Sequence, residues 1–283
     1  MIVKKLSVLS SVSIGSNICA VVKKEQKNID VVILDNQLNL REELTALPGS
    51  RAFILWGDES RLLIGVDDRL ILFEDGNSKA VLEARPGNFF WHSIVVNDKV
   101  FVQEYGEPPT GIYVSEDLVS WVRVVDNLSV DKSSKHFHYI GYDPYRDWLI
   151  ATLGDGNLVR VIYSPDHGKS WKPLYKGPWQ FVPFAVLEDK LVFGFDSGIA
   201  RGGVGIYHPA RGSWQFIFFE PMTNVRYMRF SDLLYVRELD MYVAAFGSPQ
   251  LFAVSRDLVY WHPLLVEGYD ADYNYHMGLL RVG

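Results

Sequence analysis

The stretch Tyr163-Ser-Pro-Asp-His-Gly-Lys-Ser-Trp171 decides the fold, because shorter forms of it recur along the chain. Its pattern is Ser-x-Asp-x-Gly-x-x-Trp, and the variant Ser-x-Asp-Leu-Val-x-Trp stands at residues 115–121 and again at 255–261. A fourth copy, at residues 207–214, keeps the Gly and the Trp but has no Asp. These turns start at residues 115, 164, 208 and 255. A unit of about 47 residues therefore repeats along the chain.

Short apolar segments bounded by Gly, Asp, Asn and Pro surround each turn, and helical periodicity is nearly absent. Residues 52–56 and 99–103 are examples, and such five-residue segments are typical of β-strands. Two further hairpins without the motif, at residues 34–38 and 73–77, complete six turns with room for four short strands each. We therefore predict an all-β chain that forms a six-bladed β-propeller of four-stranded antiparallel blades. The alternative is a five-bladed propeller with an irregular N-terminal extension.

The repeat also predicts how the chain is divided. We expect a single propeller domain over residues 1–283, in which residues 273–282 pair beside the N-terminal strands and close the ring. The expected blades cover residues 1–47, 48–87, 88–130, 131–178, 179–222 and 223–268. Within the fourth blade the expected strands are residues 136–142, 148–153, 159–164 and 171–175.

The four turns resemble the Asp-box (BNR-repeat) propellers, a superfamily that includes the sialidases. In that motif the Asp accepts turn N–H groups, the Gly supplies a positive φ and the Trp packs under the hairpin, so the resemblance implies a fold and not an activity. A vaguer resemblance, over residues 90 to about 220, is to a group of microbial BNR-repeat proteins. It rests on Glu104-Tyr-Gly, His136-Phe-His138, Tyr142-Asp-Pro-Tyr145 and Thr152-Leu-Gly-Asp155.

Composition excludes several classes of partner. Of 283 residues 48% are hydrophobic and 14% aromatic, and the net charge is −6 with no basic run, so we expect neither a nucleic acid nor a membrane as partner. The single Cys19 excludes an intrachain disulfide and a thiolate zinc cluster. Lys4 and Lys5 before residues 6–14 have the outline of a signal peptide, but four serines interrupt the apolar stretch. We interpret it as a strand and expect a cytoplasmic protein.

In a propeller, the loops that start the innermost strands and the loops between second and third strands open on one face. Histidines from three blades and one glutamine fall at that level, namely His92, His138, Gln180 and His276. They could bind a divalent metal such as Mn, Fe or Zn. This set is similar to that of the oligogalacturonate lyase propellers, which implies a metal that neutralises a uronate carboxylate during β-elimination. Each His can equally be a hydrogen-bonded strand residue.

The same loops carry carboxylates, aromatic rings and arginines. Glu104, Asp155 and Asp196 could provide the acid and base of glycoside hydrolysis, with His138 as a further catalytic candidate. Turn capping explains the two aspartates as well. The residues that could bind substrate are Trp91, Tyr105 and Trp179, by stacking on sugar rings, and Arg226 and Arg229, by clamping a carboxylate.

Two functions fit these residues. The first is a carbohydrate-active enzyme, a polysaccharide lyase or glycoside hydrolase, that acts on an acidic glycan at the mouth of the central channel. The alternative is a non-catalytic propeller that binds a glycan or a protein partner. Sialidase activity is disfavoured, because the chain has no Arg-Ile-Pro strand of the kind that carries the first arginine of those enzymes.

Overall fold

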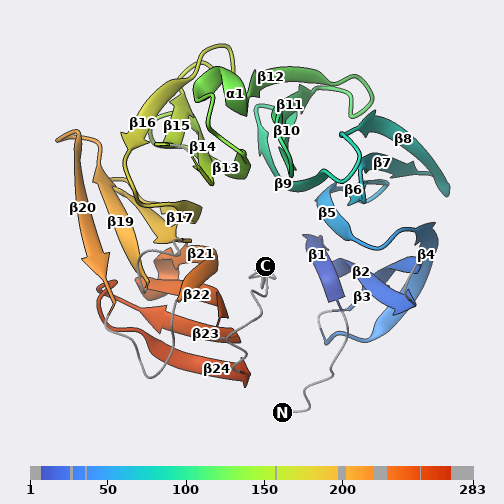
Figure 1. Cartoon of the computed structure of the whole chain (residues 1–283). Helices are drawn as coiled ribbons and strands as arrows, with labels where there is room; N and C mark the ends of the chain where they lie inside the picture. The colour runs from blue at the N-terminus through green and yellow to red at the C-terminus, as the bar shows by residue number, and fades with distance from the viewer. Residues whose placement is uncertain are drawn as a thin grey trace. The chain divides into compact units, whose positions relative to one another are not determined.

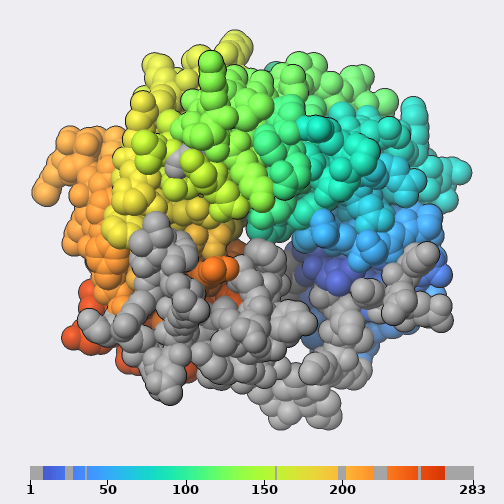
Figure 2. Space-filling view, viewed as in Figure 1, coloured from blue at the N-terminus to red at the C-terminus, as the bar shows by residue number. Residues whose placement is uncertain are grey.

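The computed structural model describes residues 8–25, 28–35, 37–156, 158–196, 202–219, 228–248 and 250–268 (Figure 1; the other residues are grey in Figure 2). These residues form 24 strands in six sheets, and each sheet consists of four consecutive antiparallel strands. Two short helical turns, α1 (Asn127–Val130) and η1 (Arg237–Leu239), complete the described elements. Among the described residues, no helix is long and apolar enough to cross a lipid bilayer.

The sheets follow one another in chain order. The first contains β1 (Val8–Ile14), β2 (Asn17–Glu25), β3 (Asn28–Leu34) and β4 (Leu40–Pro48), and the second β5 (Ala52–Gly57), β6 (Arg61–Val66), β7 (Arg69–Glu74) and β8 (Asn77–Glu83). The third contains β9 (Phe89–Val96), β10 (Lys99–Tyr105), β11 (Gly111–Ser115) and β12 (Val122–Asp126), and the fourth β13 (His136–Asp143), β14 (Trp148–Gly154), β15 (Val159–Ser164) and β16 (Lys172–Lys176). The fifth contains β17 (Phe181–Val186), β18 (Leu191–Phe195), β19 (Gly203–His208) and β20 (Ser213–Phe218), and the sixth β21 (Arg229–Val236), β22 (Met241–Ser248), β23 (Gln250–Ser255) and β24 (His262–Gly268).

Six sheets of four antiparallel strands are the composition of a six-bladed β-propeller, so the predicted fold class is confirmed. The five-bladed alternative is wrong, because residues 8–48 and 52–83 form two complete sheets although neither carries the repeated motif. The segment predicted to close the ring, residues 273–282, lies outside the described residues.

The chain divides into two compact units. Of the described residues, the first unit holds those up to Ser129 together with Lys135–Ile140, and the second holds Val130–Ser134 and the residues from Gly141 onward. In the first unit, apolar side chains such as Val21, Val31 and Ile54 join the first sheet to the second. A second cluster joins the second sheet to the third, and in the second unit a third cluster joins the fifth sheet to the sixth. Burial of apolar side chains between neighbouring sheets is thus the main stabilising contribution within each unit.

One position near the end of the second strand of a sheet touches the innermost strand of the next sheet. Where this residue is polar, its side chain donates a hydrogen bond to a carbonyl of that strand, from Gln103 to Phe137 over 2.7 Å and from Thr152 to Val182 over 3.1 Å. Where it is glycine, a Cβ would collide with the neighbouring strand, at 2.9 Å from the Phe90 carbonyl for Gly65 and at 2.5 Å from the Phe230 ring for Gly194. In the second to fifth sheets, close packing is thus met at this position by glycine or by a side chain that bonds to the backbone.

The repeated turns have the internal hydrogen bonds that their residue types predict. The Asp166 carboxylate accepts the Ser170 amide over 2.8 Å, and Asp117 and Asp257 each accept two turn amides over 2.7–2.9 Å. Gly168 has a φ of +92°, as predicted, but in the shorter copies leucines take the positive φ, with +65° at both Leu118 and Leu258. Both leucine side chains are buried, which offsets the strain of the backbone.

These hydrogen bonds predict a loss of stability in acid. Hydrogen bonds from the Ser170 side chain and amide lower the pKa of Asp166 to about 2, whereas an ordinary aspartate has a pKa of about 3.9. A carboxylate with a lowered pKa in the folded state stabilises the protein at pH values above its ordinary pKa. This stabilisation is lost as the pH falls from about 4 to about 2. We expect the midpoint of urea unfolding to fall less between pH 6 and pH 3 in Asp166→Asn than in the wild type. An equal fall in both proteins would contradict this.

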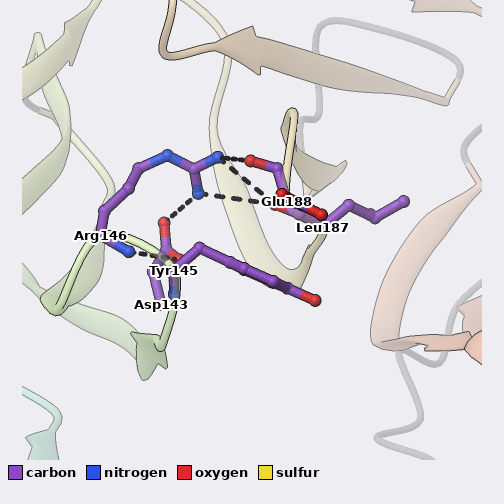
Figure 3. A network of polar contacts seen from close by, with 5 residues as sticks. All are labelled: Asp143, Tyr145, Arg146, Leu187 and Glu188. Atoms are coloured by element: carbon purple, nitrogen blue, oxygen red, sulfur yellow. Dashed lines mark hydrogen bonds and ion pairs between the residues drawn. The ribbon is translucent and has the colours of Figure 1, made fainter.

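A buried ion pair joins two hairpins of the second unit. Asp143, at the end of β13, is fully buried, and its carboxylate accepts the amides of Tyr145 and Arg146 over 3.0 and 3.3 Å. The Arg146 guanidinium bonds to the same carboxylate and continues to the carbonyls of Leu187 and Glu188, in the hairpin between β17 and β18 (Figure 3). One arginine therefore neutralises a buried charge and links the fourth sheet to the fifth.

Candidate functional site

An irregularity in β9 determines the direction of Trp91. In the pairing of β9 with β10, His92 lies opposite Gln103 and Phe90 lies opposite Glu104, so Trp91 is an extra residue that forms a β-bulge. A bulge turns two consecutive side chains toward the same face of a sheet. The Trp91 and His92 rings accordingly lie next to each other, with centroids 4.7 Å apart. Both side chains are partly exposed.

The loop that follows β10 is held in place by Asn88. The Asn88 side-chain amide donates to Glu104 Oε1 over 2.8 Å and to the Glu107 carbonyl over 2.9 Å, while its oxygen accepts the Glu107 amide over 2.7 Å. Gly106 lies against Asn88 with a φ of +141°. Tyr105 is thereby fixed at the rim of the sheet, where its ring lies edge-on to Trp91 at 4.9 Å.

The carboxylate of Glu104 is buried and bonded to protein groups. Besides Asn88 it accepts the Gly111 amide and the Tyr113 hydroxyl, each over 3.1 Å, and the residue is 2% exposed. Burial, together with the Glu104 charge, raises the pKa of Tyr113 to about 12, so that its hydroxyl remains a donor at neutral pH. The structure thus places Glu104 beneath the loop as a support. Its predicted catalytic role stays a prediction.

Two buried histidines of β13 lie beside Tyr105. His136 Nδ1 lies 2.9 Å from the Gly106 carbonyl, so this nitrogen carries a proton and donates to it. His136 Nε2 lies 3.2 Å from His138 Nε2, and in the neutral pair the proton between them belongs to His138. The Tyr105 ring lies 4.0 Å from His136 and 6.2 Å from His138. A metal ion could therefore reach His138 only through Nδ1.

We call these rings, together with two neighbours, the aromatic–histidine cluster. It consists of Phe89, Trp91, His92, Tyr105, His136, His138 and Tyr139, all in the first unit. The Tyr139 ring lies 4.5 Å from His92. The cluster thus combines flat apolar faces with imidazole and phenol groups that can hydrogen-bond.

The other predicted residues that the structure describes gather in the second unit. The side chains of Asp155 and Gln180 bond to each other over 3.2 Å, and Gln180 also accepts from the Arg160 guanidinium over 3.2 Å. The Asp196 amide donates to the Gln180 carbonyl over 2.9 Å, and the Asp196 carboxylate forms an ion pair with Arg229 at 3.6 Å. This places Gln180 beside two of the predicted acids.

The Trp179 ring is packed between other rings of the second unit. It stacks on Phe195 at 5.7 Å with an interplanar angle of 11°, and the Phe218 ring meets it edge-on at 5.1 Å. One face of Trp179 is thereby used for packing against the rings of the fifth sheet.

The predicted metal set is only partly described. His276 lies outside the described residues, as does Arg226 of the predicted substrate-binding set. Among the described residues, no group of three or more His, Cys, Asp or Glu side chains is arranged to hold a metal ion. The side chain of Gln180 bonds to Asp155, and His138 Nε2 lies against His136 Nε2. The metal stays a prediction that the described residues do not complete.

Sequence reasoning did not find Asn88, Tyr139 or the role of His136. The pattern His136-Phe-His138 was a usable signal for His136, because residues two apart on a strand project to the same face. No pattern marks Asn88, whose contact with the loop spans 16 to 19 residues of the chain.

Comparisons with known proteins support the fold and do not name an activity. No protein-family model matches the chain, and no curated protein matches its sequence. Among solved structures, the GH74 enzyme of Niastella koreensis is similar, with a TM-score of 0.64 and 11% identity over 91% of this chain. The chain spans 46% of the length of that enzyme. A nidogen/laminin complex is similar at a TM-score of 0.49 and 9% identity, over 76% of this chain and 81% of that one. At such identities the likeness to the GH74 enzyme establishes the fold alone.

Proposed function

We propose that the protein binds a carbohydrate at the aromatic–histidine cluster. The observation that carries this proposal is the bulge in β9, which presents Trp91 and His92 on one face with Tyr105 edge-on to the Trp91 ring. A pyranose ring has apolar faces that pack on an indole and hydroxyl groups that bond to imidazole and phenol. The fold shared with a GH74 enzyme is compatible with such a ligand.

The geometry favours binding over hydrolysis at this cluster. Glycoside hydrolysis needs two carboxyl groups that flank the scissile bond. The carboxylate next to the cluster, Glu104, is 2% exposed and accepts hydrogen bonds from Asn88, Gly111 and Tyr113. The side chains of Asp155 and Asp196 are themselves engaged, in bonds to Gln180 and to Arg229 respectively. The non-catalytic alternative is therefore the one we adopt.

Replacing Trp91 tests the proposal. We expect Trp91→Ala to weaken binding of oligosaccharides from a panel of neutral and acidic glycans at least tenfold, about 1.4 kcal/mol, because the largest stacking surface is lost. Trp56→Ala is the matched control, since Trp56 is also partly buried in the first unit but packs against Arg61. Isothermal titration calorimetry measures the affinity, and urea unfolding shows that each variant is folded. Equal affinity of Trp91→Ala and the wild type would overturn the proposal, as would a wild type that binds no glycan.

A further inference from the structure

Arg51 adds a positive charge at the edge of the aromatic–histidine cluster. The residue directly precedes β5, and its backbone amide donates to Asp67 Oδ1 over 3.0 Å. Its guanidinium carbon lies 4.0 Å from the centroid of the Phe89 ring, which is a cation–π contact. The side chain is exposed. The charge is therefore held against the protein by a ring and still faces solvent.

Phe89 connects this charge to the rings that we propose to bind the carbohydrate. The Phe89 ring lies 5.1 Å from Tyr105 and 6.3 Å from Trp91. Phe53 stacks on Phe89 at 5.6 Å with an interplanar angle of 14°, which fixes the orientation of the Phe89 ring. Arg51 is thus separated from Tyr105 by a single ring whose position the packing determines.

The charge of Arg51 is not neutralised within the described part of the chain. No ion pair there involves its guanidinium, whereas Arg41 pairs with Asp35 at 3.0 Å and Arg61 pairs with Asp58 at 2.7 Å. Asp67 is an acid near Arg51, and both of its carboxylate oxygens accept hydrogen bonds from Ser50, while Oδ1 also accepts the Arg51 amide. In a chain of net charge −6, a cation in this position favours an anionic ligand.

We propose that Arg51 makes the cluster specific for acidic carbohydrates, by bonding to the carboxylate of a uronic acid unit next to the sugar that stacks on Trp91. This rests on the proposed function and adds the chemical class of its ligand. A planar guanidinium forms two parallel hydrogen bonds with a carboxylate, which an ammonium group cannot reproduce. Arg226 and Arg229 were the arginines predicted for this role. Arg229 instead pairs with Asp196 in the other unit.

The test compares uronic acid hexasaccharides (galacturonate, glucuronate and mannuronate series) with the same hexasaccharides after reduction of each carboxyl group to an alcohol. We expect the wild type to bind the acidic form at least tenfold more tightly than the reduced form. Arg51→Ala should lose this preference while it binds the reduced form as the wild type does. Arg51→Lys should keep part of the preference for the acidic form. Arg41→Ala removes an exposed arginine of the same unit and should keep the whole preference.

The outcomes separate this inference from the proposed function. If the wild type binds both forms equally, or if Arg51→Ala keeps the tenfold preference, the role of Arg51 is wrong and carbohydrate binding stands. If the wild type binds neither form nor any glycan of the wider panel, the proposed function is wrong, and the proposed role of Arg51 is then wrong as well. Trp91→Ala should weaken both forms alike, because stacking does not depend on the carboxyl group.

Discussion

Replacing Arg146 with alanine is expected to lower the free energy of unfolding by about 3–5 kcal/mol, because the substitution leaves a buried carboxylate without its counter-ion. The Asp143 side chain is fully buried, and Arg146 is the side chain that bonds to its Oδ2 atom. The two backbone amides that Asp143 accepts both bond to Oδ1. The carbonyls of Leu187 and Glu188 also lose their donor, which removes one of the links between the fourth and fifth sheets.

Matched variants separate the buried charge from other effects of this substitution. Arg211→Ala removes an exposed arginine of the same unit and should change the free energy of unfolding by no more than about 0.5 kcal/mol. The double variant Asp143→Asn/Arg146→Leu removes both charges and keeps an oxygen for the two amides, so it should regain most of the loss. Urea unfolding followed by tryptophan fluorescence gives the three values. A loss below about 1 kcal/mol in Arg146→Ala would show that the pair contributes little.

The strands were predictable from the sequence because strand and turn signals are local. In the fourth sheet, each boundary of the four expected strands lies within one residue of the observed β13, β14, β15 and β16. The first two sheets carry no motif, and the prediction there rested on the apolar segments at residues 6–14 and 52–56 and the turns at residues 34–38 and 73–77. Short-range steric and hydrogen-bonding preferences determine these elements, and such preferences can be read from neighbouring residues.

The candidate site was only partly predictable, because its geometry depends on contacts between distant residues. Trp91, His92, Tyr105 and His138 were found from their positions relative to the repeat, and the structure brings them together in one unit. The bulge that turns Trp91 toward His92 depends on the register with β10, which sequence spacing does not determine.

Burial explains the other differences at the site. Glu104 has the residue type of a catalytic acid, but a carboxylate at the second strand of a sheet can equally bond to the adjacent loop, and only the packing decides between these roles. Arg51 lies in a loop that starts the first strand of a sheet, as the predicted site residues do, but the sequence did not single it out, because its contact with Phe89 joins two sheets. Contacts of this kind leave no pattern in neighbouring residues.

The loop that carries Tyr105 depends on Gly106, and Gly106→Ala should lower the free energy of unfolding by about 3 kcal/mol. The φ of +141° is open to glycine and strained for alanine, at a cost of about 1–3 kcal/mol. A Cβ would in addition lie 2.1 Å from Asn88 Oδ1 and 2.9 Å from Asn88 Cα, so the loop has to move away from the residue that holds it. The bonds from Asn88 to Glu107 would then break, and the carbonyl that accepts His136 Nδ1 would shift.

Gly76→Ala is a control for the cost of a positive φ without a neighbouring contact. Gly76 also has a positive φ, +75°, but nothing lies within 4 Å of its added Cβ, so the backbone strain alone should cost about 1 kcal/mol. The excess cost at Gly106 then contains the greater backbone strain at φ +141° and the contact with Asn88, and the part due to the contact should disappear when Gly106→Ala is made in Asn88→Ala, since coupled residues are not additive. Because Tyr105 moves with the loop, glycan affinity should fall together with stability in Gly106→Ala and stay unchanged in Gly76→Ala. Equal losses of stability in both glycine variants would mean that Asn88 does not hold the loop, and the rigid presentation of Tyr105 would then need another cause.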